Sequence, residues 1–343
     1  MFSPHARGTD QILKWETEED IGKWQPRKAR KGEKEHDKES DVDRELMAKA
    51  ASRPGRAIML LGGENGWGGK RSVEVLDLQE SRAAGWAACP PSMKSSRFAF
   101  GAAHNSGSIY VMGGESLLLG GSKSAERFDY SSSSAKNWTV LSPMKKKRQW
   151  LGCAVLNDSI YAIGGSTDTV EFYDIHTNQW HACCPLKNGK RSGLAAVSLE
   201  GLIYAIGGKG EEGILSSMES FDERRGRWEQ HASMLSKRAS LGAVVVDGKI
   251  YAIGGTYKKL GIHTKMEVYD PRKDQWQEGV PMLLPRRSMA AVADGQKIYV
   301  IGGSGIISAM SSVHTFDTTT QTWTEEANSI MEARNDAAAV VVD

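Results

Sequence analysis

A Gly-Gly pair that recurs six times, each time after a short apolar run such as "IYAIGG", constrains this chain more than any other feature. A tryptophan follows each pair. The distance from that tryptophan to the next pair is 26 or 27 residues, whereas the distance from a pair to its own tryptophan varies from 15 to 24 residues. A fixed period with one variable segment indicates a repeat protein whose repeats each carry a loop. The pairs are Gly62 and Gly63, Gly113 and Gly114, Gly164 and Gly165, Gly207 and Gly208, Gly254 and Gly255, and Gly302 and Gly303. The tryptophans are Trp86, Trp138, Trp180, Trp228, Trp276 and Trp323.

Each repeat contains four strand-like segments, here named A to D. In the fifth repeat they read "LGAVVV", "KIYAIGG", "MEVYD" and "DQWQE". The first two are joined by Asp247-Gly248, a dipeptide typical of a β-hairpin turn. Four short antiparallel strands in each repeat of about 50 residues predict the blade of a β-propeller.

The two ends of the repeat region complete one another. The first repeat begins at a B strand, "AIMLLGG" at 57–63, and the chain ends at an A strand, "RNDAAAVVVD" at 334–343. Joined, they make one complete blade, which would close the ring and remove its exposed sheet edges. The sequence therefore predicts six blades, with the C-terminal strand completing the first.

The pattern of Gly-Gly, then Tyr-Asp or Phe-Asp, then Trp, repeated six times over 57–343, resembles the kelch repeat. The resemblance implies an all-β fold, a six-bladed kelch β-propeller. The recurrent glycines are then expected at sharp turns with positive φ, and the tryptophans in the packing between blades. We interpret both sets as structural rather than as a cofactor or phosphate site.

Residues 1–56 differ in composition from the rest of the chain. They hold 13 Lys and Arg and 12 Asp and Glu, so we predict a disordered charged tail. Its cluster Arg27, Lys28, Arg30, Lys31 could direct nuclear import. A net charge of +2 and the lack of a long apolar run predict neither nucleic-acid nor membrane binding. Four cysteines without framework spacing favour a cytoplasmic protein.

One arginine recurs at the start of every A strand, 16 residues before a Gly-Gly pair where a pair follows. The D-to-A and B-to-C connections should emerge on one face of the ring. We therefore predict that these arginines surround the channel mouth and bind carboxylates of a partner. They are Arg97, Arg148, Arg191, Arg238, Arg286 and Arg334. The alternative is that each pairs with the acid of its own C strand, a position that His314 occupies in the sixth repeat.

Among the B-to-C loops, Trp67 and Tyr257 are the aromatic candidates for partner contacts. No nucleophile motif, phosphate loop or metal-ligand spacing is present, so we predict no cofactor, no metal and no enzyme activity. Some kelch propellers are enzymes, among them a copper oxidase and a sugar mutarotase, and this class stays open as an alternative.

The favoured function is protein-protein interaction by a monomeric propeller, which binds an acidic segment of its partner. The chain is similar to the kelch-like substrate adaptors. This resemblance implies recognition of a partner by arginines, and it also implies N-terminal BTB and BACK domains that engage a cullin ubiquitin ligase. Residues 1–56 are too few for those domains. A shortened ligase adaptor, a stand-alone scaffold and an actin-binding protein are all compatible with this pattern.

Overall fold

The computed structural model describes residues 56–66, 68–79, 85–116, 120–131, 137–258 and 261–343. These residues form β-strands, turns and loops, and none of the described elements is a helix. The described part of the chain accordingly offers no helix able to cross a bilayer. Residues 1–55 of the predicted tail, with its basic cluster, and Trp67 lie outside the described residues.

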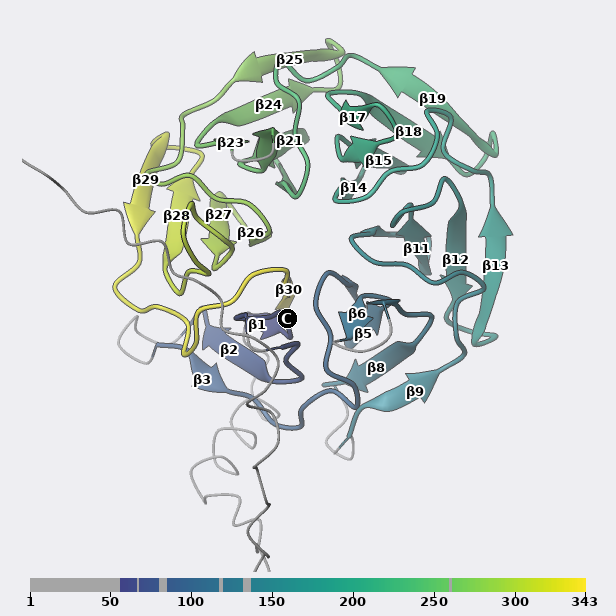
Figure 1. The fold of residues 1–343 in the computed structure, drawn as a ribbon, viewed down its shortest axis with the longest axis horizontal. Coiled ribbons are helices and arrows are strands. Elements are labelled where there is room, and N and C mark those ends of the chain that lie inside the picture. Colours follow the sequence, from purple (N-terminus) through teal and green to yellow (C-terminus); the bar gives the residue numbers. More distant parts are fainter. Residues whose placement is uncertain (1–55, 67, 80–84, 117–119, 132–136, 259–260) are drawn as a thin grey trace, which may run out of the picture. The chain divides into compact units, whose positions relative to one another are not determined.

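The strands form six four-stranded antiparallel sheets, the blades of a propeller (Figure 1). From the inner to the outer strand, blade 1 is β30 (Ala338–Val342), β1 (Ala57–Leu61), β2 (Val73–Asp77) and β3 (Ala87–Ala88); blade 2 is β4 (Gly101–Asn105), β5 (Ser108–Met112), β8 (Ala125–Asp129) and β9 (Thr139–Leu141); blade 3 is β10 (Gly152–Leu156), β11 (Ser159–Ile163), β12 (Val170–Asp174) and β13 (Gln179–Cys183); blade 4 is β14 (Ala195–Leu199), β15 (Leu202–Ile206), β18 (Met218–Asp222) and β19 (Arg227–His231); blade 5 is β20 (Gly242–Val246), β21 (Lys249–Ile253), β24 (Met266–Asp270) and β25 (Gln275–Glu278); blade 6 is β26 (Ala290–Asp294), β27 (Lys297–Ile301), β28 (Val313–Asp317) and β29 (Thr322–Glu325).

Three short hairpins lie in B-to-C connections, in addition to the blades. They are β6 (Glu115–Ser116) with β7 (Gly120–Gly121), β16 (Lys209–Gly210) with β17 (Gly213–Ile214), and β22 (Thr256–Lys258) with β23 (Gly261–Ile262). Because strand direction alternates across a blade, the B-to-C and D-to-A connections share one face of the ring, which we call the loop face.

The predicted closure of the ring is confirmed. Strand β30 pairs antiparallel with β1, from Ala57 opposite Val342 to Leu61 opposite Ala338. Figure 1 shows the C-terminal strand beside β1 at the inner end of blade 1. The fold is therefore the six-bladed propeller that the repeats predict, with both ends of the repeat region in one sheet.

The six A strands surround the propeller axis and contact one another in the circular order β4, β10, β14, β20, β26, β30. They line a cavity of about 360 Å³. Small residues are needed where these strands begin: a Cβ added to Gly152 would lie 2.9 Å from that of Ala196, and one added to Gly242 2.8 Å from that of Ala291. The sequence therefore keeps these starts small because neighbouring blades converge there.

The Gly-Gly pairs lie where one blade meets the next. Gly254 has φ +58°, and a Cβ there would lie 2.5 Å from the carbonyl oxygen of Arg286 in the following blade. The amide of Gly255 donates a hydrogen bond of 2.8 Å to that same oxygen. All six pairs repeat this contact with the next arginine along the ring. The turn demands glycine because of both its backbone conformation and this close approach.

The tryptophans also join neighbouring blades. The indole Nε1 of Trp180 donates to the carbonyl of Ser142, which follows the outer strand of the preceding blade, at 2.8 Å. Trp138, Trp228, Trp276 and Trp323 make the corresponding bond. Each ring is buried and so adds apolar area to the same junction.

Candidate functional site

The six recurrent arginines are buried inside the propeller, with exposed fractions of 0 to 2%. Each guanidinium lies between strands of its own blade. In blade 3, Nη1 of Arg148 donates to the carbonyls of Gly164 at 2.6 Å and Thr169 at 2.7 Å, and Nη2 donates to Oε1 of Glu171 at 2.8 Å. The arginine thus fastens the B-to-C connection and the C strand to the start of the A strand.

The predicted position of the arginines at the channel mouth is therefore wrong, and their internal pairing with C-strand acids is what the structure shows. Arg97, Arg148, Arg191, Arg238 and Arg334 each form an ion pair with the C-strand glutamate of their own blade. Arg286 is equally buried but faces His314. No guanidinium of this set is exposed to hold a partner's carboxylate, because each is buried and its Nη atoms donate to groups of its own blade.

The mouth of the channel is formed instead by the residue two positions beyond each arginine. These six residues all have φ between +50° and +61°. Each amide donates to the carbonyl of the equivalent residue in the blade before it, at 2.7 to 2.9 Å, which closes a circle of six hydrogen bonds. The six are Ala99, Trp150, Gly193, Ser240, Ser288 and Asp336. The backbone of the mouth is consequently fixed, while its side chains differ from blade to blade.

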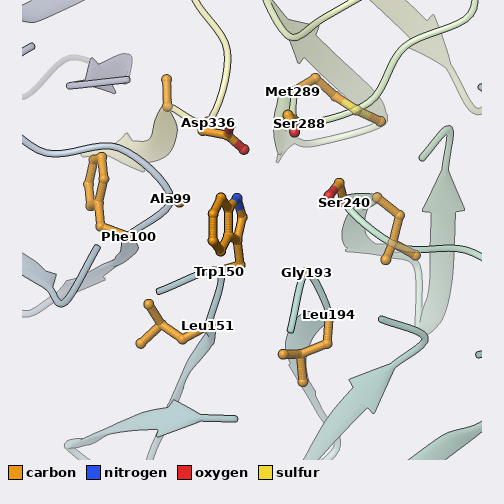
Figure 2. Close-up of a pocket in the computed structure, with 12 residues that line it drawn as sticks. Ala99, Phe100, Trp150, Leu151, Gly193, Leu194, Ser240, Ser288, Met289 and Asp336 are labelled. Atoms are coloured by element: carbon orange, nitrogen blue, oxygen red, sulfur yellow. The ribbon is translucent and has the colours of Figure 1, made fainter. Parts of the chain in front are cut away.

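This circle encloses a small pocket of about 120 Å³. Figure 2 shows the indole of Trp150 and the carboxylate of Asp336 near one another, with the hydroxyls of Ser240 and Ser288 turned toward the same space. Burial raises the pKa of the half-buried Asp336 to about 6, although hydrogen bonds from Ser288 and Trp150 oppose that shift. The mouth thus presents one carboxylate and one indole, and no guanidinium from the six arginines.

Around the mouth, the surface of the loop face divides into two parts of different chemistry. The connections leading into blades 2, 3 and 4 (residues 89–100, 142–151 and 184–194) carry exposed lysines and no acidic residue. We call these lysines the basic sector. They are Lys94, Lys145, Lys146, Lys147, Lys187 and Lys190, the last of which forms an exposed ion pair of 2.9 Å with Glu211 in the B-to-C connection of blade 4.

Blades 5, 6 and 1 present apolar side chains on the same face. Of the eight large hydrophobic residues exposed among the described residues, seven lie in B-to-C or D-to-A connections of these blades, and Val140 on β9 is the eighth. We call the seven the apolar sector. They are Leu235, Tyr257, Leu283, Leu284, Ile306, Ile307 and Met331.

Of the two predicted aromatic contacts, the structure describes Tyr257. Its ring is 43% exposed, lies 4.6 Å from the ring of His263 between centroids, and carries the ammonium of Lys258 at 5.3 Å. Three sets of residues were missed in the sequence: the residue two positions beyond each arginine, the lysines of the basic sector and the leucines of the apolar sector. A variable position beside an invariant one in every repeat was the signal that could have found them.

In the described part of the chain, no group of three or more His, Cys, Asp or Glu side chains is placed to hold a metal ion. Most of the buried acids are already committed to arginine, as described above.

Comparison with solved structures supports the fold. The structure of YjhT superposes with a TM-score of 0.64 at 15% identity, and covers 72% of this chain and 88% of its own. Among curated proteins, Kelch-like protein 40 of Xenopus laevis is 33% identical over 135 residues, which is 35% of this chain and 21% of that protein. Human Kelch-like protein 33 is 29% identical over 194 residues, 50% of this chain and 35% of that protein. The chain thus spans about a fifth to a third of the length of these relatives.

The Kelch motif model matches residues 151–186, 190–235, 237–283 and 285–329, which together make up about half of the chain. These stretches include four of the six Gly-Gly pairs, the buried Arg191, Arg238 and Arg286, and four of the six tryptophans. The chain belongs to the kelch-repeat proteins.

Proposed function

We propose that this propeller is a protein-interaction module whose loop face binds a partner segment that carries both acidic and apolar side chains. The observation that carries the proposal is the division of the loop face into a basic sector and an apolar sector. Both sectors are built from positions that vary between repeats, on a frame held rigid by the buried arginines. Loops that vary on a rigid scaffold are where binding residues concentrate.

The basic sector supplies the attraction for acidic side chains. Lys145, Lys146 and Lys147 stand consecutively at the surface, and the amides of the first two are fixed by Glu171, at 2.6 and 3.0 Å. The loop is therefore held while its ammonium groups stay in solvent. Clustered charge of one sign speeds encounter with an opposite charge and selects against like-charged partners.

The apolar sector supplies area that gains from leaving water. Ile306 is 81% and Ile307 95% exposed, values unusual for such side chains. Their loop is joined to the connection carrying Leu283 and Leu284, because Arg287 and Ser304 exchange backbone hydrogen bonds of 3.1 and 2.8 Å. A contiguous apolar patch rimmed by polar groups is typical of a protein-interaction site.

The recognition role agrees with the family, whose kelch-like members are mainly interaction modules. In the adaptors that the chain resembles, the propeller recognises the protein to be ubiquitinated. We include ubiquitination of the bound partner in the proposal, as the step that would follow partner binding in a larger assembly.

Peptide display on the purified chain tests the partner chemistry. A random peptide library panned against it should enrich sequences that combine Asp or Glu with Leu, Ile or Phe. A selected peptide should bind the triple variant Lys145→Glu, Lys146→Glu, Lys147→Glu at least about tenfold more weakly, a loss of about 1.4 kcal/mol. The double variant Ile306→Ser, Ile307→Ser should weaken it by a similar factor.

The matched control carries two charge reversals on the opposite face, Arg224→Glu and Lys273→Glu, at exposed positions of C-to-D turns. This control should bind the peptide within about twofold of the unmodified chain. Enrichment of basic peptides, or equal losses in the control and the loop-face variants, would contradict the proposal. Co-purification of a cullin with the unmodified chain from cells would extend it to a ligase adaptor.

A further inference from the structure

Blade 6 departs from the other five blades at the partner of its buried arginine. In blade 5, Oε1 of Glu267 accepts from Nη2 of Arg238 at 2.7 Å, and its two oxygens accept from the amides of Leu235 at 2.7 Å and Ser236 at 3.0 Å. Blades 2 and 3 repeat this pattern. Blades 1 and 4 keep the arginine and one amide. One carboxylate thus joins the arginine to the connection that precedes it.

In blade 6 the carboxylate is replaced by the imidazole of His314, which is fully buried. Arg286, also fully buried, donates from Nη1 to the carbonyls of Gly302 at 2.9 Å and Ser312 at 2.8 Å, and from Nη2 to Oγ of Ser312 at 2.7 Å. All these acceptors are neutral. Arg286 therefore keeps its hydrogen bonds to the frame but has no buried counter-charge.

Neither ring nitrogen of His314 has a hydrogen-bond partner, and both are buried. The amides equivalent to those of Leu235 and Ser236 belong to Leu283 and Leu284, and His314 accepts from neither. Its nearest acid is Glu325 on β29, 4.0 Å from Nε2 and 59% exposed. The guanidinium of Arg286 and the amides of Leu283 and Leu284 therefore lack the shared carboxylate acceptor that their equivalents have in the other blades.

Electrostatics favour negative charge at this place. Burial lowers the pKa of Arg286 to about 10, which leaves it protonated at neutral pH. Burial and the nearby Arg286 lower the pKa of His314 to about 4, so the imidazole is neutral there. A buried charge whose partner is missing is strongly destabilising. An anion bound beside Arg286 would offset that loss and would accept hydrogen bonds from the donors that lack a partner.

We propose that blade 6 binds a small monovalent anion from solution, such as chloride or formate, between Arg286 and the amides of Leu283 and Leu284. The ion has the role of the glutamate carboxylate of the other five blades and lies beside the imidazole of His314. Those glutamates are 0 to 3% exposed, so the place is enclosed and excludes large ions such as gluconate. Leu283 and Leu284 are exposed on the loop face, and we infer that the ion enters from that face. The site shares Leu283 and Leu284 with the apolar sector, but anion binding does not rest on the proposed partner recognition.

Thermal unfolding at constant ionic strength tests the site. Sodium chloride or sodium formate replaces sodium gluconate stepwise at about pH 7.5, where His314 is neutral. The unfolding midpoint of the unmodified chain should rise saturably with either small anion, because a ligand that binds only the folded state stabilises it by mass action. A response that is linear and equal for all anions would indicate general salt effects and contradict the proposal.

Two matched variants place the ion in blade 6. His314→Glu restores the carboxylate, so it should melt above the unmodified chain in gluconate and lose the saturable response. Glu267→His gives blade 5 the same pairing of arginine with imidazole and should add a second saturable response. Glu325→Gln should keep the response; a response seen only in this variant would show that Glu325 already neutralises Arg286, and would overturn the proposal.

Direct detection removes the dependence on stability. Chlorine-35 line broadening should be stronger with the unmodified chain than with His314→Glu, and crystals grown in bromide should show an anomalous peak beside Arg286. Equal broadening by the two proteins, or a bromide crystal without that peak, would overturn the proposal.

Discussion

The inner and outer layers of the D-to-A connections make the most instructive comparison in this molecule. In the inner layer, an arginine recurs in every blade and is buried at 0 to 2% exposure. In the outer layer, three residues earlier, the blades carry Lys94, Lys145, Asn188, Leu235, Leu283 and Met331 in turn. All six of these outer residues are exposed.

The difference separates structure from recognition. What repeats is needed by every blade, because each must fasten its inner strand to its neighbour. What diverges is free of that demand and can carry surface chemistry. Changes in the inner layer should therefore cost stability, and changes in the outer layer should cost binding. Changes to either layer test this division, and their expected effects on the free energy of unfolding decrease from closure of the ring to the surface lysines.

Removing residues 334–343 should have the largest effect. The deletion takes away β30, which supplies the whole inner edge of blade 1, and Arg334, which pairs with Glu74. The loss is comparable with the whole stability of a domain, about 5–15 kcal/mol. Differential scanning calorimetry should show no cooperative transition, while a chain lacking only Asp343 should melt like the parent. A parent-like transition in the longer deletion would refute closure by this strand.

Glu171→Ala should rank second. The change leaves the fully buried Arg148 without its carboxylate and frees the amides of Lys145 and Lys146. Breaking such a buried pair from one side costs about 3–5 kcal/mol. Urea denaturation should report this loss. Glu278→Ala, which breaks the exposed pair with Lys265, should cost less than about 1 kcal/mol. Equal losses would show that burial of the clamp contributes nothing.

Asp336→Asn should have an intermediate, pH-dependent effect. Because burial raises the folded-state pKa of Asp336 to about 6, folding favours the protonated acid, and the unmodified chain loses stability as pH rises from about 4 to about 6. Above that range the free energy of unfolding of the variant should exceed that of the unmodified chain by about 1 kcal/mol. This is less than about 1.36 kcal/mol for each pKa unit of the shift would give, because the half-buried side chain is partly screened by solvent.

Denaturation at about pH 4 and pH 7.5 checks the sign. Asp174→Asn provides the opposite case, because hydrogen bonds from Thr177 and the amide of His176 lower the pKa of Asp174. That variant should be less stable than the parent at neutral pH and approach it as pH falls through the lowered pKa. A pH-independent difference for Asp336→Asn would contradict the raised pKa.

Reversing the charges of Lys145, Lys146 and Lys147 together should have the smallest effect on stability, within about 0.5 kcal/mol. The side chains are exposed, and the fixed amides remain. A loss as large as that of Glu171→Ala, measured in the same urea titration, would show that the outer layer also holds the fold.

The sequence was sufficient to predict the propeller, its six blades and its closure, because Gly-Gly turns and strand order repeat with a fixed spacing. It was not sufficient to place the arginines. An arginine at the start of a strand fits either an exposed collar or an internal clamp, and only the burial of Arg148 against Glu171 distinguishes them. The acid needed for the internal pairing was visible in the C strand.

The loop face was harder to predict because its residues do not repeat. Ser240 and Asp336 lie at the mouth because the backbone turns there with positive φ, and no pattern of side chains in the sequence predicts this turn. Ile306 and Leu283 lie in different connections, and they belong to one surface because Arg287 and Ser304 pair across the gap. Such neighbours are set by the ring geometry rather than by distance along the chain.

Hydrogen-exchange mass spectrometry with a display-selected peptide is the most direct test that recognition lies on the divergent layer of the loop face. We expect slower exchange on peptide binding in residues 142–151, 279–289 and 304–312, with no change in the C-to-D turns around Arg224 and Lys273. Protection confined to those turns, or absent from both loop-face sectors, would contradict it.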